Sequence, residues 1–322
     1  MTDPATGMPA QLDPAPLLAL LDLLEGRRYR FVTPTPASHA RVVARPDRTV
    51  ARRVEDVLGW SLPFDAALAE DEAIVLLDRA GALTPVDASG QRRALVRVSS
   101  LHGRLYLHSA YPTEAEDAVF FGPDSYRFAD QIAAELERRG LYVSARLLDI
   151  GTGAGVGAIV AADHAPEAQV FATDINPAAL LVAGVNAQAA GRRIELVEGE
   201  GMGDVPGLFD LVTANPPYII DPAARAYRDG GGMHGAEIAL RMTREGMARL
   251  APGGRLILYT GSAIVDRRDV LAETLAADAK AAGLSLRYRE IDPDVFGEEL
   301  AEPFYADVDR IALVAAVITR GC

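Results

Sequence analysis

The chain has 322 residues, enough for two domains of ordinary size. Hydrophobic residues make up 49% of the sequence and charged residues 24%, which is ordinary for a globular protein with a large buried core. The formal net charge of -13 argues against a protein that coats nucleic acid without sequence preference.

The first predicted element is a helix that begins at Pro14 and ends at Gly26, after residues 1–12, which are expected to be a loose terminus. Its apolar run, residues 17–24, is far shorter than the roughly 20 residues of a membrane span, and it contains Asp22. No basic segment of a signal peptide precedes this run. The sequence therefore predicts a cytoplasmic protein with no membrane partner.

A basic segment, residues 27–53, follows the first helix and contains Asp47 as its single acid. Its arginines are Arg27, Arg28, Arg30, Arg41, Arg45, Arg48, Arg52 and Arg53. Two interpretations stay open. The segment is either a solvated helix face in a protein rich in arginine, or a surface for an anionic partner such as RNA, DNA or the ribosome.

Two further helices are predicted over residues 38–58 and 64–80. Apolar and polar residues then alternate over residues 93–98 and 104–108, a pattern typical of a β-hairpin. Short helices before a hairpin indicate a winged-helix-like unit. We expect residues 1–112 to form an α+β domain for substrate recognition, although such a unit also serves as a structural module.

From about residue 146 onward, strand-like apolar runs alternate with helical stretches, which predicts an α/β fold with a Rossmann-like, doubly wound sheet over residues 113–322. The runs are residues 147–150, 169–173, 194–197, 208–214, 255–260, 285–290 and 310–319. No helix separates the last two runs, so they are expected to form a closing antiparallel hairpin.

A glycine-rich turn follows the first of these runs. Its candidate cofactor-binding residues are Asp149, Gly151, Thr152, Gly153 and Gly155. Glycines let the backbone approach a ligand closely, and the helix that follows offers free N–H groups. A tight turn without a ligand has the same pattern. The same glycines also fit a dinucleotide fingerprint, which keeps an NAD enzyme among the alternatives.

The second run ends at Asp174 and Ile175, where a carboxylate can accept the two hydroxyls of a ribose. The alternative is that Asp174 or Asn176 caps the helix that begins at Pro177. After the third run, Glu200 is a candidate for contact with an adenine amino group or is merely solvated.

These residues resemble the class I methyltransferases. The pattern Asp149-x-Gly151-x-Gly153-x-Gly155 matches their first motif, and Asp174 matches their ribose-binding acid. The resemblance implies that S-adenosyl-L-methionine is the cofactor and that the loop wraps its methionine end.

The fourth run ends in Asn215-Pro216-Pro217-Tyr218, at the carboxyl edge of the predicted sheet. Two prolines make this turn rigid, so the Asn215 side chain and the Pro216 carbonyl can point acceptors outward, and Tyr218 adds an aromatic face. Two acceptors that hold the N–H hydrogens of a planar nitrogen can turn its lone pair toward a methyl donor. The assigned catalytic residues are Asn215, Pro216 and Tyr218, with Pro217 and Tyr218 at the substrate, and Asn215 is also a candidate cofactor-binding residue. A Pro-Pro turn with a capping Asn is the alternative.

Asn215-Pro-Pro-Tyr218 resembles the signature shared by adenine-N6, guanine-N2 ribosomal RNA and glutamine N-methyltransferases, and a dehydrogenase has no use for it. Residues 120–126 and the glycine-rich residues 227–237, with Arg228 as a candidate substrate clamp, resemble the flanks of that signature in small-domain methyltransferases. The resemblance covers about residues 118–320. Residues 12–110 are unlike the helical bundle of the release-factor enzymes.

The sequence thus favours an N-methyltransferase that acts on a nucleobase amine in RNA or DNA. The alternatives are a protein glutamine methyltransferase and a non-catalytic cofactor-binding scaffold. No metal is expected, because Cys322 is the single cysteine and the five histidines are scattered.

Overall fold

The computed structural model describes residues 12–322 except residues 224 and 226, so the predicted loose terminus lies outside the described residues apart from Leu12. The chain divides into two compact units, each described separately. The first unit contains the segment up to Arg127 together with Gly153–Gly155 and Asn176–Arg193. The second contains the remainder of the chain and the whole large sheet.

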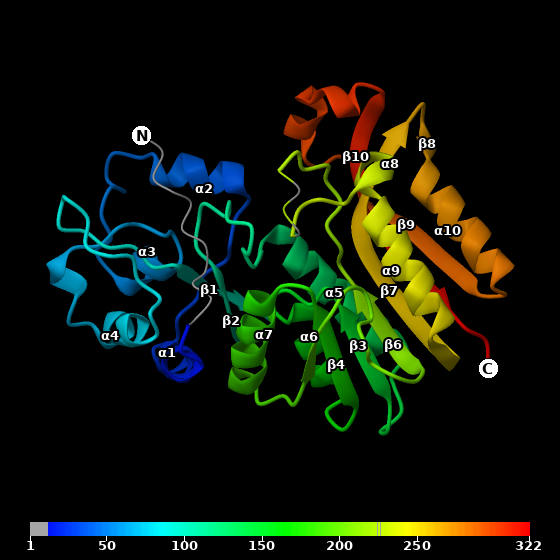
Figure 1. The fold of residues 1–322 in the computed structure, drawn as a ribbon, viewed down its shortest axis with the longest axis horizontal. Coiled ribbons are helices and arrows are strands. Elements are labelled where there is room, and N and C mark those ends of the chain that lie inside the picture. The colour runs from blue at the N-terminus through cyan, green and yellow to red at the C-terminus, as the bar shows by residue number, and fades with distance from the viewer. Residues whose placement is uncertain (1–11, 224, 226) are drawn as a thin grey trace. The chain divides into compact units, whose positions relative to one another are not determined.

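Short helices precede a two-stranded hairpin in the first unit (Figure 1). The elements are α1 (Pro14–Gly26), α2 (Pro36–Val43), α3 (Val54–Leu58), η1 (Ala66–Leu68), α4 (Glu72–Arg79), β1 (Val96–Leu101), β2 (Arg104–Ser109) and α7 (Pro177–Ala189). The hairpin is confirmed, and its register pairs Leu101 with Arg104. The two turn residues between them, His102 and Gly103, both have positive φ, as a tight hairpin turn requires.

Two predicted helices are shorter than expected. The helix predicted over residues 38–58 is split into α2 and α3, because Pro46 removes a backbone donor and disfavours helical geometry at Arg45. The helix predicted over residues 64–80 begins only at Glu72, where the Asp71 side chain caps α4 by accepting a hydrogen bond from Ala73 N. Phe64 instead forms an isolated bridge with Arg92.

The large sheet has the strand order β5-β4-β3-β6-β7-β10-β9, with β8 paired to β7. Its strands are β3 (Arg146–Ile150), β4 (Gln169–Asp174), β5 (Glu195–Glu198), β6 (Phe209–Ala214), β7 (Leu250–Val265), β8 (Arg268–Asp269), β9 (Ser285–Asp292) and β10 (Val308–Thr319). Strands β3 to β7 pair in parallel, and β10 is antiparallel to both β7 and β9. This confirms the predicted doubly wound α/β sheet and its closing antiparallel pair.

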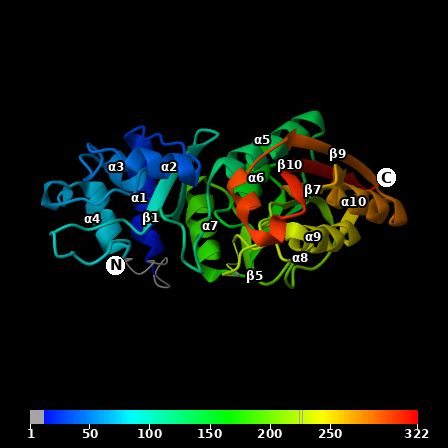
Figure 2. The same cartoon turned by 90° about the horizontal axis from the view of Figure 1, so that it is seen from above.

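Helices cover both faces of the sheet. Figure 2 shows α9 and α10 on one face and α5 on the other. The helices are α5 (Pro123–Arg138), α6 (Val156–His164), α8 (Gly232–Gly235), α9 (Glu237–Ala248) and α10 (Val270–Ala281), with the short turns η2 (Gly297–Ala301) and η3 (Pro303–Tyr305). Buried Leu240 on α9 and Leu275 on α10 join sheet residues such as Leu258 in one apolar core. No helix among the described residues is long and apolar enough to cross a membrane.

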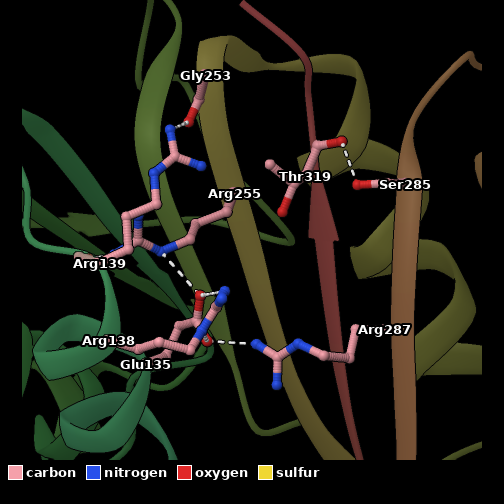
Figure 3. Close-up of polar contacts among 8 residues, drawn as sticks. All are labelled: Glu135, Arg138, Arg139, Gly253, Arg255, Ser285, Arg287 and Thr319. Atoms are coloured by element: carbon pink, nitrogen blue, oxygen red, sulfur yellow. Dashed lines mark hydrogen bonds and ion pairs between the residues drawn. The ribbon is translucent and has the colours of Figure 1, made fainter.

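At the amino edge of the sheet, α5 is fixed by a charged cluster (Figure 3). The buried carboxylate of Glu135 pairs with Arg138 at 2.8 Å, with the buried Arg255 at 3.5 Å, and with Arg287. Arg139 donates a hydrogen bond to the carbonyl of Gly253 at 2.9 Å. This cluster joins α5 to the amino ends of β7 and β9.

Candidate active site

The glycine-rich turn after β3 has the conformation that its sequence requires. Gly151, Gly153 and Gly155 have φ values of +65°, +53° and +83°, which residues with a Cβ rarely adopt. Thr152 N donates a hydrogen bond to the carbonyl of Thr173 at 2.9 Å, so the turn is held against the end of β4. An ideal Cβ built at Gly153 meets no atom within 4 Å, which leaves space beside the backbone.

Asp149, at the end of β3, is buried and turns both carboxylate oxygens to protein donors. Thr152 Oγ1 and Ala158 N donate to Oδ2 at 2.6 and 3.1 Å, and Thr213 Oγ1 donates to Oδ1 at 2.7 Å. Burial raises the pKa of Asp149 to about 6, although these hydrogen bonds oppose the rise. Asp149 thus joins the glycine turn to β6. Its role in cofactor binding stays a prediction.

Three of the predicted residues lie at one level of the sheet. In the strand register, Ile150 pairs with both Thr173 and Ala214. The next residues along the three strands, Gly151, Asp174 and Asn215, therefore leave the carboxyl edge of the sheet side by side. This juxtaposition of the glycine turn, the carboxylate and the signature is the candidate active site.

The helix-cap alternative at the end of β4 belongs to Asn176. Its side-chain oxygen accepts a hydrogen bond from Ala178 N at 3.0 Å at the start of α7. Asp174, which is half-buried, is therefore not the cap. Ile175 is 52% exposed, an unusual position for a large apolar side chain and one open to a ligand.

Glu200 lies at an exposed position. Its exposed carboxylate forms an ion pair with Arg241 of α9 at 2.6 Å. A contact between Glu200 and an adenine would have to compete with that ion pair, and the role of Glu200 in binding stays a prediction.

The signature residues leave β6 with mixed burial. Asn215 and Pro217 are half-buried, whereas Pro216 is buried. Tyr218 is only 8% exposed, so its ring is a packed side chain rather than the open aromatic face expected from the sequence. The ring packs edge-on against Phe296, with 5.7 Å between ring centroids, and a Cβ at Gly261 of β7 would lie 2.2 Å from Tyr218 Cδ2.

The glycine-rich stretch after the signature folds back onto it. Gly230 N donates a hydrogen bond to the carbonyl of Ile219 at 2.8 Å, and a Cβ at Gly235 would lie 2.3 Å from the carbonyl oxygen of Tyr218. Glycine is needed here because the two backbones touch. Arg228, the candidate substrate clamp, forms an ion pair with Glu299 in this structure.

Sequence reasoning missed several residues that hold this site. They are Thr213, Phe296, Glu299 and Tyr305. Thr213 Oγ1 donates to Asp149, and Tyr305 Oη accepts a hydrogen bond from Ile220 N at 2.8 Å. Residues 296–305 lie about 80 residues beyond the signature in the chain, so no local pattern in the sequence points to them.

The chain is similar to several known proteins. A family model described as a methyltransferase small domain matches residues 129–281. A release factor glutamine methyltransferase of Deinococcus radiodurans is 32% identical over 223 residues, which cover 66% of this chain and 76% of that protein. The chain belongs to the small-domain methyltransferases. It is therefore an S-adenosylmethionine-dependent methyltransferase, as the glycine turn and the signature indicate.

Two further similarities concern shorter segments or the fold. A ribosomal protein uL3 glutamine methyltransferase of Bradyrhizobium diazoefficiens is 37% identical over 131 residues, 36% of this chain and 40% of that protein. The crystal structure of a methyltransferase from Pyrococcus furiosus has a TM-score of 0.43 and 20% identity, and the match covers 64% of this chain and 89% of that one.

The residues present in this methyltransferase fit S-adenosylmethionine. The glycine turn leaves open space beside its backbone at Gly153, and the Asp174 carboxylate lies one strand away. The cofactor supplies an activated methyl group when bound.

Proposed function

We propose that this methyltransferase modifies the side-chain amide of a glutamine in a protein substrate. The observation that carries the proposal is the similarity to a release factor glutamine methyltransferase over 76% of that protein's length. This function corresponds to the protein glutamine methyltransferase that the sequence analysis gives as an alternative, not to the nucleobase methyltransferase that it favours.

The signature suits an amide acceptor. An amide nitrogen is a weak nucleophile because its lone pair is delocalised into the carbonyl group. In the proposed complex, the Asn215 side chain and the Pro216 carbonyl accept hydrogen bonds from the amide N–H groups and orient the nitrogen. Tyr218 keeps the turn in place from within the core, since its ring is packed between Phe296 and Gly261.

Electrostatics near the signature also support a protein acceptor. The connection between β9 and β10, residues 293–307, contacts Tyr218 through Phe296 and contains no Lys, Arg or His. Its acids are Asp294, Glu298, Glu299, Glu302 and Asp307, of which Glu299 pairs with Arg228 and Asp307 with His234. Negative charge beside the acceptor site disfavours approach of a phosphate backbone.

The basic segment, residues 27–53, supports a nucleic-acid surface less than its composition suggests. Arg27 pairs with Asp71 at 2.8 Å and Arg48 pairs with Asp56 at 3.1 Å. Arg53 lies 3.9 Å from Glu55. Binding of RNA or DNA by the remaining arginines, and substrate recognition by residues 1–112, stay predictions.

The experiment that tests the proposal is a transfer assay with tritiated cofactor. The acceptors are a purified release factor, ribosomal protein uL3 and a cell extract, and the products are digested with nuclease or with protease. We expect label that survives nuclease and, by mass spectrometry, a methyl group on a glutamine. Label that nuclease removes and protease leaves would refute the proposal.

Asn215→Ala is the control variant for this assay. It removes the side-chain acceptor at the amide, so turnover should fall by at least about 100-fold, the scale of a lost transition-state contact. Affinity for the cofactor, measured by titration calorimetry, should change little. Equal losses of turnover and cofactor affinity would contradict the role assigned to Asn215.

A further inference from the structure

The connection between β9 and β10, residues 293–307, lies at the same edge of the sheet as the signature. Val308 at the start of β10 pairs with Val265 at the carboxyl end of β7, and Asp292 at the end of β9 pairs with Leu313. Strand β7 is parallel to β6, so the connection joins two strands at the carboxyl edge where Asn215 leaves β6. Figure 1 shows this orange-red segment beside the top of β10.

Two polar contacts join this connection to the chain segment that follows Asn215. Tyr305 Oη accepts a hydrogen bond from Ile220 N at 2.8 Å. Glu299, whose side chain is 13% exposed, forms an ion pair with Arg228. A third contact, between His234 Nε2 and Asp307 Oδ1 at 3.0 Å, is more exposed and contributes less.

An aromatic contact completes the junction. The ring of Phe296 packs edge-on against the ring of Tyr218, the last residue of the signature. Phe296 itself has a positive φ of +54°, a conformation that costs energy for a side chain of this size and that the surrounding contacts must hold. Four contacts along residues 296–307 therefore reach four points along residues 218–234.

We propose that residues 293–307 are a specificity element that holds the acceptor-binding segment in place and sets its affinity for the substrate protein. Glu299 and Tyr305 are its positioning residues. Glu299 holds the Arg228 guanidinium in place, and Tyr305 fixes the backbone directly after the signature. The substrate class rests on the proposed function, whereas the positioning rests on the contacts alone.

The matched pair Glu299→Gln and Glu298→Gln tests this proposal. Both variants remove one negative charge from adjacent positions, but Glu299 pairs with Arg228, whereas Glu298 is exposed. For Glu299→Gln we expect the KM for the acceptor to rise about three- to tenfold, with little change in the Kd of the cofactor. Glu298→Gln should retain the wild-type KM. Equal KM values for the two variants, or a parallel loss of cofactor affinity in Glu299→Gln, would overturn the proposal.

A second measurement needs no acceptor. Amide hydrogen exchange in peptides that contain Ile220 and Gly230 should be faster in Glu299→Gln and in Tyr305→Phe than in the wild type, and unchanged in Glu298→Gln. Unchanged exchange in both of the first two variants would overturn the proposal. If the acceptor is a nucleic acid, the proposed function fails, but the same comparison of KM values with that acceptor still decides the role of residues 293–307.

Discussion

The carboxylate of Asp149 is buried and accepts hydrogen bonds from three donors. The two threonine hydroxyls and Ala158 N hold it between the glycine turn and β6, and a Cβ at Gly157 would lie 2.2 Å from its Oδ1. Burial raises its pKa from 3.8 to about 6. The ionised form is thus costly, and the turn depends on it because a protonated carboxyl would lose one acceptor position.

This pKa predicts a pH dependence with a defined sign. The folded chain binds a proton on Asp149 between about pH 4 and 6, where the unfolded chain does not, so this group lowers the free energy of unfolding as pH rises through that window. The difference in unfolding free energy between wild type and Asp149→Asn should fall by about 2 kcal/mol from about pH 4 to pH 6. Urea unfolding at the two pH values measures it. A difference independent of pH would show that Asp149 titrates normally.

Some features of single residues can be predicted from the sequence and others cannot. The positive φ values of Gly151, Gly153 and Gly155 follow from a strand–glycine–helix pattern, because glycine adopts them without steric cost. The bond from Thr213 to Asp149 depends on the register of two strands about 60 residues apart, which no local pattern encodes. The Tyr218 ring does not form the aromatic face expected from the sequence, because it is buried against Phe296.

At the scale of elements, Asn186 connects α7 to the hairpin and to the glycine turn. Its side chain, 1% exposed, accepts a hydrogen bond from Leu107 N at 2.7 Å and donates to the carbonyls of Leu107 and Ala154, both at 2.9 Å. Leu107 lies in β2, so a single amide occupies the hydrogen-bonding groups that a neighbouring strand would otherwise pair. All these groups belong to the first unit.

Asn186→Leu keeps the volume of the side chain and removes all three hydrogen bonds. The buried groups of Leu107 and Ala154 lose their partner, so unfolding free energy should fall by at least about 2 kcal/mol. Because Ala154 lies inside the glycine turn, the Kd of the cofactor should rise, while kcat at saturating cofactor stays close to wild type. Gln188→Leu, at an exposed position of the same helix, is the control in calorimetry and steady-state kinetics. A loss confined to kcat would remove Asn186 from this role.

Helices and strands with a clear hydrophobic pattern could be predicted from the sequence. Contacts between segments far apart in the chain could not. The apolar runs of β3, β4, β6, β7 and β10 mark strands that are mostly buried on both faces, which is why the centre of the sheet follows from the sequence. The break between α2 and α3 was missed, although Pro46 signals it. The contacts of residues 293–307 with the signature could not be predicted, because packing across the sheet edge determines them.

At the scale of the whole molecule, the candidate active site and the charged cluster around Glu135 lie at opposite edges of the sheet. The carboxyl edge carries Gly151, Asp174 and Asn215, whereas the amino edge carries the cluster around Glu135. Burial by itself would raise the pKa of Glu135, but hydrogen bonding to Arg138 and the charges of Arg287 and Arg255 lower it. Its contribution to stability is therefore complete at neutral pH and is lost only as pH falls below the ordinary value of 4.5.

Glu135→Gln should destabilise the whole sheet domain at neutral pH. The guanidinium of Arg255 is 1% exposed, and it would keep its hydrogen bond to the carbonyl of Arg139 but lose its carboxylate partner, at a cost of about 3 kcal/mol. Glu137→Gln, two residues along α5 at an exposed position, removes the same charge and should change stability by less than about 0.5 kcal/mol. Thermal and urea unfolding at pH 7 compare the two. Because the cluster lies at the edge away from Asn215, the residual folded fraction of Glu135→Gln should retain the wild-type Kd for the cofactor. Equal stability of the two variants would mean that the cluster is solvated and contributes little.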